Sequence, residues 1–434
     1  MRVLLVGPGD LADEVEAALE AEQAEVVRLG EPEHEELAVA LADGPWDRVT
    51  VVTRSDAVAL RLALSIRREE PELPMLVTIF DHTAAEQLRA ADEHVEVTSL
   101  AEIVAPSLAG PCVEEGLAAL RVGEDGAVAI RTEDGTVREE PFSPRQQSTR
   151  VFGLLTSLAR PYDRSAALLV YGALGILTVL VVETIGAMIA IDQGFVDALY
   201  GSAKTLASVD ANQPVADGPA SFKMITTVAM LVGLFFEALF TAGLVNRLID
   251  RRLTAWVGRR SVPREHHVVV VGLGKVGLRL CQLLRAAGVR VVGVDVEEDG
   301  EYVGRAKEDG IAVVIGRGAD PSLLRRLSLP RASALAAVTA DDLENLSIAM
   351  TARSIAPDLR IVLRAEEAHL ADQTRSFLGL GVVRDIHQIA AALLAARSTG
   401  SSAQSVLSHE DEAHLVHDGG RLERAAVLGA EDAG

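Results

Sequence analysis

Two long apolar stretches lie in the middle of this 434-residue chain. Residues 165–191 contain SAALLVYGALGILTVLVV before their only acid, Glu183, and residues 223–249 contain MITTVAMLVGLFFEALFTAGLVN with the single acid Glu237. Either stretch, as a helix, is long enough to cross a hydrocarbon core of about 30 Å. Core helices of soluble proteins seldom run this far without charge on any face. We therefore predict two membrane-spanning helices rather than two buried helices of a soluble protein.

Positive charge is concentrated outside these stretches and is scarce between them, where only Lys204 and Lys223 occur. The flanking arginines are Arg145, Arg150, Arg160 and Arg164 before the first stretch and Arg247, Arg251, Arg252, Arg259, Arg260 and Arg264 after the second. Because cytoplasmic loops carry the excess of lysine and arginine, we expect a multi-pass plasma-membrane protein with both termini in the cytoplasm. The start, MRVLLVGPGD, predicts a strand and a turn rather than a secretory leader.

Composition narrows the function classes. The net charge of −22 opposes binding to nucleic acid phosphates. Two cysteines, Cys112 and Cys281, exclude a disulfide scaffold and a four-thiolate zinc site, and we assign no metal ligands. The first 150 residues hold 31 acids and 13 arginines. We interpret these acids as solvated helix faces, with a site for Ca²⁺ or Mg²⁺ between subunits as the alternative.

A dinucleotide-binding pattern follows the second stretch. VVVVGLGKVG predicts a buried strand and a glycine turn, followed by a helix and by a second strand, VRVVGVD, that ends at Asp295. Such glycines allow a tight turn and a close approach of backbone to phosphates, and the acid can bind a ribose. A Rossmann-like fold with an empty crevice is the alternative. The candidate ligand residues are Gly272, Leu273, Gly274, Lys275, Val276, Gly277 and Asp295.

The N-terminal region begins in the same way, with Gly7, Gly9 and Ala12 at the three turn positions. Its second strand ends with Arg28-Leu29-Gly30 instead of an acid, so we expect the fold there without nucleotide binding. Residues 51–77 also align without gaps to residues 337–363, which indicates two copies of one domain, the first lacking part of its middle.

These residues place two Rossmann-like α/β domains around the apolar stretches. The first domain is predicted at 1–142, and its residues 120–142 predict a small β appendage. A linker follows at 143–164, then the spanning helices at 165–191 and 223–249 with a loop between them at 192–222. A second linker is predicted at 250–264, the second domain at 265–398 and a polar, disordered tail at 399–434.

The second domain resembles a regulator of K⁺ conductance (RCK) domain, the cytoplasmic gating module of potassium channels and transporters. The resemblance rests on GLGKVG, GVD, IGRGADPSLL, AVTADDLENL and RIVLRA. It implies that NAD(H), ATP or ADP binds as a regulatory ligand. In that family a Gly-Asp-Ala-Thr segment closes the site, whereas this chain has Gly316-Arg317-Gly318-Ala319-Asp320. The resemblance therefore adds Gly316, Arg317, Asp320 and Thr339 to the candidate ligand residues.

The apolar part resembles the pore module of two-helix tetrameric cation channels, in which a re-entrant pore helix and a filter lie between the two spans. A pore helix is expected at about 194–206. The filter position, TVGYG in potassium channels, is occupied by Ser208-Val209-Asp210-Ala211-Asn212. Without glycine, a queue of backbone carbonyls is improbable. A ring of four Asp210 carboxylates favours divalent or unselective passage, and the segment resembles the filters of the Castor and Pollux channels. A solvated turn is the alternative for Asp210.

The second span carries a stripe of small or polar residues: Thr226, Ala229, Gly233, Glu237 and Thr241. Because lipid rejects such a stripe, we predict that Glu237 lines the pore and that Gly233 lets the helix bend during gating. A close helix contact is the alternative. For Glu183, in the first span, we expect a structural hydrogen bond to the pore helix.

Together these features predict a multidomain fold in which two Rossmann-like RCK domains flank an all-α pore module with two spanning helices and a re-entrant loop. The predicted function is a ligand-gated homotetrameric cation channel in the lipid bilayer, with permeating cations and no nucleic acid as partners. The alternatives are a potassium channel with a divergent filter and a nonconducting membrane nucleotide sensor. We find no catalytic constellation and predict no enzyme, although a membrane-tethered NAD oxidoreductase would share the glycine fingerprint.

Overall fold

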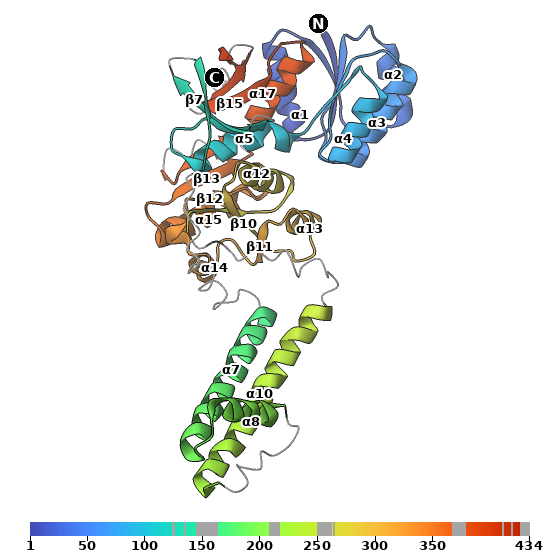
Figure 1. Ribbon diagram of the computed structural model, residues 1–434. Coiled ribbons are helices and arrows are strands. Elements are labelled where there is room, and N and C mark those ends of the chain that lie inside the picture. Colours follow the sequence, from blue (N-terminus) through green and yellow to red (C-terminus); the bar gives the residue numbers. More distant parts are fainter. Residues whose placement is uncertain are drawn as a thin grey trace. The chain divides into compact units, whose positions relative to one another are not determined.

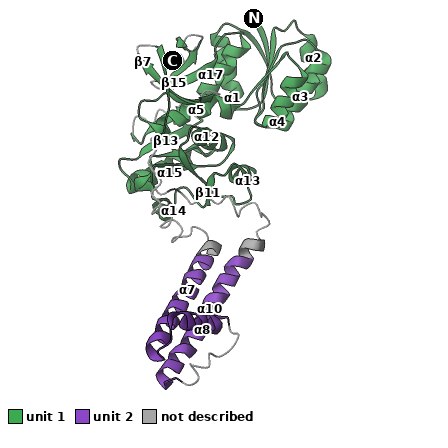
Figure 2. Ribbon diagram, in the orientation of Figure 1, with its two compact units in different colours: residues 1–146, 263–434 green, residues 147–262 purple. Residues whose placement is uncertain are grey.

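The computed structural model describes residues 1–123, 126–133, 136–144, 164–207, 218–249, 263, 265–366, 379–409, 412–417 and 420–425. The chain forms two compact units, one from residues 1–146 and 263–434 and the other from residues 147–262 (Figure 2). The second unit is thus inserted into the first between its two halves. Each unit is described below by itself.

The N-terminal half of the first unit is built on a wholly parallel five-stranded sheet of order β2-β1-β3-β4-β5. The inner strands β1, β3 and β4 are nearly continuous runs of buried residues, as expected when helices cover both faces of a parallel sheet, whereas no residue of the edge strand β2 is fully buried. The elements are β1 (Arg2–Val6), α1 (Asp10–Ala21), β2 (Glu25–Leu29), α2 (His34–Ala42), β3 (Arg48–Val51), α3 (Asp56–Glu69), β4 (Met75–Thr78), α4 (His82–Ala91) and β5 (Val95–Thr98).

The C-terminal half repeats this plan with six parallel strands in the order β11-β10-β9-β12-β13-β14. The additional strand, β11, and the short helix α14 have no counterpart in the first half, which confirms that the first copy lacks part of its middle. The elements are β9 (His267–Val271), α12 (Lys275–Ala286), β10 (Arg290–Asp295), α13 (Glu301–Glu308), β11 (Ala312–Ile315), α14 (Pro321–Arg326), a 3₁₀ turn (Leu329–Arg331), β12 (Ala334–Ala337), α15 (Asp342–Ile355), β13 (Arg360–Ala365) and β14 (Val382–Asp385).

The two halves exchange a helix. After β5, α5 (Leu100–Val113) packs on α12 and on β12 and β13 of the other half. After β14, α17 (Ile386–Ser398) packs on α1, β3 and β4 of the first half, as Figure 1 shows for α17 and α1. The buried hydroxyls of Thr50 and Ser398 lie 2.6 Å apart at this contact. Because the exchanged helices share one apolar core with both sheets, the halves form a single folding unit rather than two separate domains.

A three-stranded antiparallel sheet follows each exchanged helix. The first sheet, β6 (Ala119–Gly123), β7 (Gly126–Glu133) and β8 (Thr136–Pro141), confirms the predicted β appendage. The second, β15 (Ser405–His409), β16 (Glu412–Val416) and β17 (Leu422–Arg424), corrects the prediction of a disordered tail from residue 399.

The internal repeat explains this ordered tail. The strands of the two small sheets begin at residues 119 and 405, 126 and 412, and 136 and 422, so each pair is 286 residues apart. Buried residues from both sheets, including Ile130, Leu407 and Val416, form a shared apolar cluster. A short strand needs few apolar residues when only one of its faces packs against a matching sheet. The polar composition after Ser398 therefore did not indicate a sheet.

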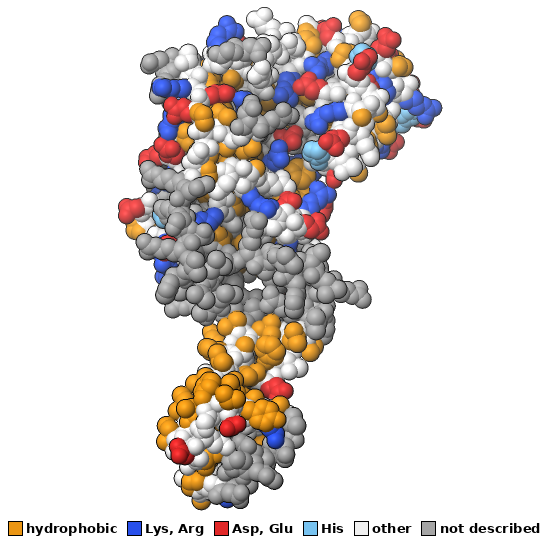
Figure 3. All heavy atoms as spheres, in the orientation of Figure 1, with side chains coloured by type: hydrophobic (Ala, Val, Ile, Leu, Met, Phe, Trp, Pro, Cys, Tyr) orange, Lys and Arg blue, Asp and Glu red, His pale blue; other side chains and the backbone are white. Residues whose placement is uncertain are grey.

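In residues 164–207 and 218–249, the part of the second unit that the structure describes, there are three helices, α7 (Arg164–Ala190), α8 (Phe195–Leu206) and α10 (Ala220–Ile249). By length and composition alone, two segments are able to span a membrane, Leu168–Ala190 and Ala220–Val245. Only 28% and 11% of their most apolar windows are buried, so they are not core helices of this unit. Figure 3 shows apolar side chains over much of the unit's visible face. α8 lies where the pore helix was expected.

Candidate functional site

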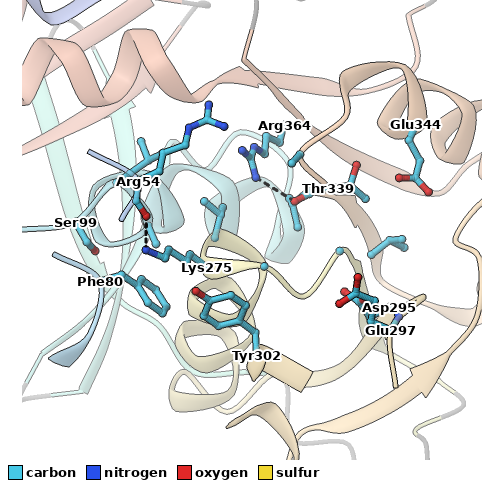
Figure 4. A pocket seen from close by; sticks show the side chains of 18 of the residues that line it. Arg54, Phe80, Ser99, Lys275, Asp295, Glu297, Tyr302, Thr339, Glu344 and Arg364 are labelled. Carbon is cyan, nitrogen blue, oxygen red and sulfur yellow. Dashed lines mark hydrogen bonds between the residues drawn. The ribbon is translucent and has the colours of Figure 1, made fainter. Parts of the chain in front are cut away.

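A cavity of about 560 Å³ opens between the carboxyl ends of the two parallel sheets (Figure 4). Both halves of the first unit line it. The C-terminal half contributes Gly272, Gly274, Lys275, Asp295, Tyr302 and Thr339 among others, and the N-terminal half contributes Thr53, Arg54, Asp56, Phe80 and Ser99. Its volume is in the range of small-molecule and cofactor sites. The sequence predicted every named residue of the first group except Tyr302 and none of the second group.

The glycines of the pattern 272–277, which joins β9 to the first turn of α12, have different roles. Gly272 has φ +95°, and a Cβ there would lie 2.8 Å from the backbone of Thr339. A Cβ on Gly277 would lie 1.8 Å from the carbonyl oxygen of Gly272, so these two glycines are required by packing. A Cβ on Gly274 would meet nothing within 4 Å.

Gly274 is therefore the glycine that packing does not explain. It lines the cavity and occupies the N-cap position of α12 without a side chain to bond the first N–H groups of that helix. An anion fits such a position because the free N–H groups and the helix dipole both favour negative charge. The turn is thus suited to the phosphates of a nucleotide.

Asp295 ends β10 beside the turn. Its carboxylate accepts hydrogen bonds from the backbone N–H of Leu273 at 2.7 Å and from that of Glu297 at 3.0 Å. These bonds hold the carboxylate against the turn and leave lone pairs on both oxygens for further donors. Asp295 lines the cavity, so a ribose diol is a suitable partner.

The N-terminal half closes the other side of the cavity through polar and aromatic contacts. The Lys275 ammonium donates to the Arg54 carbonyl oxygen at 2.8 Å and to Asp56 at 2.9 Å. The rings of Phe80 and Tyr302 meet edge to face with centroids 5.6 Å apart. No local sequence motif marks these residues as part of a binding site. The signal available in sequence was that residues 53–56 align with residues 339–342, where Thr339 is a predicted ligand residue.

One of the residues that line the cavity, Arg364, is a buried charged side chain. Arg364, on β13, is 9% exposed and forms an ion pair with Glu366, and burial lowers the pKa of its guanidinium. The Thr339 N–H donates to the side-chain oxygen of Asn345, which is 1% exposed. Thr339 is thus held at the cavity wall as the sequence predicted, whereas Arg364 was missed.

The segment 316–320 departs from its predicted role. Gly316 and Gly318 line the cavity, but Arg317 is exposed and lies outside the lining residues. The Asp320 carboxylate caps α14 by accepting from the N–H of Ser322 at 2.8 Å, and this bond lowers the pKa of Asp320. Neither Arg317 nor Asp320 therefore lines the cavity in this arrangement, and the displaced acid serves as a helix cap.

Of the remaining candidates of the turn, Leu273 and Gly277 lie behind its surface. Leu273 is 1% exposed and contributes its N–H to Asp295, and Gly277 packs beneath Gly272. Val276 lines the cavity. The predicted residues 272–277 are thus brought together, but only some of them are available to a ligand.

The equivalent turn of the N-terminal half is arranged differently. Gly30 occupies the position that Asp295 has in the other half. Arg28, two residues earlier on β2, forms ion pairs with Asp13 and with Glu16 of α1, the latter at 2.9 Å. The guanidinium thus neutralises the acids beside the turn instead of binding a ribose. This supports the expectation that the N-terminal half retains the fold without its own nucleotide site.

In the second unit, the predicted filter residues Ser208, Val209, Asp210, Ala211 and Asn212 lie outside the described residues. The residues of the predicted stripe on the second span, which is α10, differ in their burial. Thr226 and Gly233 are buried, and a Cβ on Gly233 would lie 2.9 Å from Leu206 of α8. Glycine at 233 therefore allows α8 to approach α10 closely, and its role as a gating bend stays a prediction.

The two acids of the spans also differ. Glu237 is exposed on α10, which leaves its side chain free to face a pore, a neighbouring subunit or lipid. Glu183 is 5% exposed, and within the described part of the chain neither of its carboxylate oxygens has a hydrogen-bond partner. The expected bond from Glu183 to the pore helix is not observed there.

Comparison with known proteins identifies the class of the C-terminal half. Residues 268–384 match the TrkA-N domain family. Potassium channel protein 1 of Methanocaldococcus jannaschii is 19% identical over 209 residues, covering 46% of this chain and 62% of that protein. The voltage-gated potassium channel Kch of Escherichia coli is 23% identical over 237 residues, covering 51% of this chain and 55% of Kch. The alignments thus span less than two thirds of either relative.

A solved structure shows the same fold over most of the chain. The GsuK channel superimposes with a TM-score of 0.52 over 92% of this chain and 63% of the GsuK chain, at 16% identity. The TrkA-N match is thus confined to the C-terminal half, while the chain as a whole, with two apolar helices in its middle, shares the fold of the GsuK channel. The resemblance to Castor and Pollux and a filter not selective for K⁺ stay predictions.

Proposed function

We propose that this chain is a subunit of a tetrameric, ligand-gated cation channel whose regulatory ligand is NAD(H), ADP or ATP bound in the cavity of the first unit. The observation that carries the proposal is the open Gly274 position beside Asp295, in a cavity shared by both halves of a unit that is interrupted by two apolar helices. The potassium channel relatives supply the membrane context.

Different residues of the chain bind different parts of the ligand. The first N–H groups of α12 and the Gly274 backbone receive phosphate, and the Asp295 carboxylate receives ribose hydroxyls. Residues of the N-terminal half cover the ligand from the opposite side. A ligand held in this way interacts with both halves at once, so it favours one relative arrangement of them over others. That differential binding is the source of gating, and it requires no covalent step by the chain.

Cation flux through proteoliposomes tests this function. We expect the purified protein to pass cations and the flux to change when NAD, NADH, ADP or ATP is added on the side of the first unit. Absence of flux with intact nucleotide binding would favour a nonconducting sensor. Turnover of NADH instead of simple binding would favour an oxidoreductase.

The selectivity of the proposed pore depends on Asp210. Replacing Asp210 with asparagine removes four carboxylates from a tetrameric filter, so we expect the permeability of Ca²⁺ relative to K⁺ to fall about tenfold. Reversal potentials under mixed-ion conditions measure this ratio. The matched control is Asp197→Asn, which removes an exposed acid from the first turn of α8. An equal effect of the two variants, or no effect of Asp210→Asn, would remove Asp210 from the ion path.

A further inference from the structure

Lys275 lies between the ligand turn and the opposite half of the unit. It is the first residue of α12, directly after Gly274, and its side chain is 31% exposed. Its ammonium group donates across the cavity to the Arg54 carbonyl oxygen at 2.8 Å and to Asp56 Oδ1 at 2.9 Å. Lys275, Gly274 and both partners line the same cavity. Figure 4 shows the bond from Lys275 to Arg54.

The Asp56 carboxylate is held in place independently of Lys275. It accepts from the backbone N–H of Phe80 at 3.2 Å and from that of Asp81 at 2.8 Å. Asp56 also begins α3, so its position is fixed by two elements of the N-terminal half. Because the carboxylate already has two donors, loss of the ammonium group would leave it satisfied.

A phosphate at the Gly274 turn would change the partners of Lys275. The lysine ammonium is a compact charge on a flexible stem, and a phosphate offers it charged oxygens that form stronger hydrogen bonds than a neutral carbonyl does. Lys275 follows Gly274 directly, so its side chain starts beside the position of that phosphate. The ligand and Asp56 therefore require the same ammonium group.

We propose that Lys275 selects ligands that carry phosphates at the Gly274 turn, and that Asp56 of the N-terminal half competes with those phosphates for its ammonium group. The proposal rests on nucleotide binding at this turn, as proposed above, and deepens it. The preferred ligand is a pyrophosphate-bearing nucleotide rather than a nucleoside. Binding transfers Lys275 from the N-terminal half to the ligand and thereby loosens one connection between the halves.

Calorimetric titration of the full chain with ADP and with adenosine tests the competition. Lys275→Met should lower the preference for ADP over adenosine about tenfold, because it removes a charge-assisted contact to phosphate. Asp56→Asn keeps one side-chain oxygen, which can replace the acceptor of either the Phe80 or the Asp81 N–H, and lacks the charge that holds Lys275, so ADP affinity should rise about threefold. In the double variant the asparagine should have no further effect.

A matched control separates this effect from general weakening of the contact between the halves. Arg305, on α13, pairs with Asp81 across the same interface at 3.1 Å but is not among the lining residues of the cavity. Arg305→Met should leave the preference for ADP unchanged. Lys275→Gln provides a second variant if methionine impairs folding.

The outcomes distinguish the competition from nucleotide binding itself. Unchanged ADP affinity in Asp56→Asn, or a gain that persists without Lys275, would overturn the competition while leaving the proposed ligand intact. An unchanged ADP preference in Lys275→Met would remove Lys275 from the phosphate site. Failure of the wild-type chain to bind ADP, ATP, NAD or NADH would instead refute the ligand assignment and, with it, the role of Lys275.

Discussion

Gly277→Ala is expected to destabilise the first unit by more than about 4 kcal/mol, in the range of the most damaging single substitutions. The new Cβ would lie 1.8 Å from the carbonyl oxygen of Gly272, and this neighbour is backbone, which has no rotamer with which to move away. The turn and α12 would have to separate. Thermal unfolding of the full chain measures the loss as a lower melting temperature.

Gly274→Ala is the matched control, three residues earlier. Its Cβ would meet nothing within 4 Å, so the stability should stay within about 1 kcal/mol of the wild type. Nucleotide affinity should nevertheless fall at least about tenfold, because the methyl group would occupy the place where a phosphate approaches the backbone. Normal stability of Gly277→Ala, or normal binding by Gly274→Ala, would contradict this division of roles.

Asp295→Ala is expected to reduce nucleotide affinity by about a hundredfold. The variant loses the proposed hydrogen bonds to the ribose, and bonds from a charged acceptor contribute about 1.5–3 kcal/mol each. It also loses the acceptor that holds the Leu273 N–H at 2.7 Å, so the turn becomes less ordered. Titration with NAD and ADP measures the change.

Asp320→Ala is the control for Asp295→Ala. Asp320 was predicted to bind the ligand, but its carboxylate caps α14. Its loss should affect local stability and leave nucleotide affinity unchanged. If Asp320→Ala weakens binding as strongly as Asp295→Ala, the segment 316–320 closes the site after all.

Several features were predictable because they depend on short stretches of sequence. The turn 272–277, the helix after it and the acid at the end of β10 appear within one βαβ unit, so their arrangement follows from local patterns. The length and apolar composition of α7 and α10 are likewise local properties. The constant spacing of the repeat revealed the second Rossmann-like half.

Other features were not predictable because they depend on contacts across the chain. The polar segment after Ser398 forms a sheet only because a matching sheet from the first half shares its apolar cluster. Asp320 was assigned to the ligand from its place in a family motif, whereas the start of α14 uses it as a cap. Gly233 looked like part of a pore stripe until the packing of Leu206 against it was known.

The sequence by itself determined the two apolar helices, the repeated Rossmann-type half and the glycine turn with its acid, since each is encoded by residues close together in the chain. Only the tertiary structure decided that α5 and α17 exchange places and that the two halves enclose one cavity. Lys275 and Asp56 are 219 residues apart in sequence. No local pattern specifies such a pair, because burial of the exchanged helices in the shared core brings the two residues together.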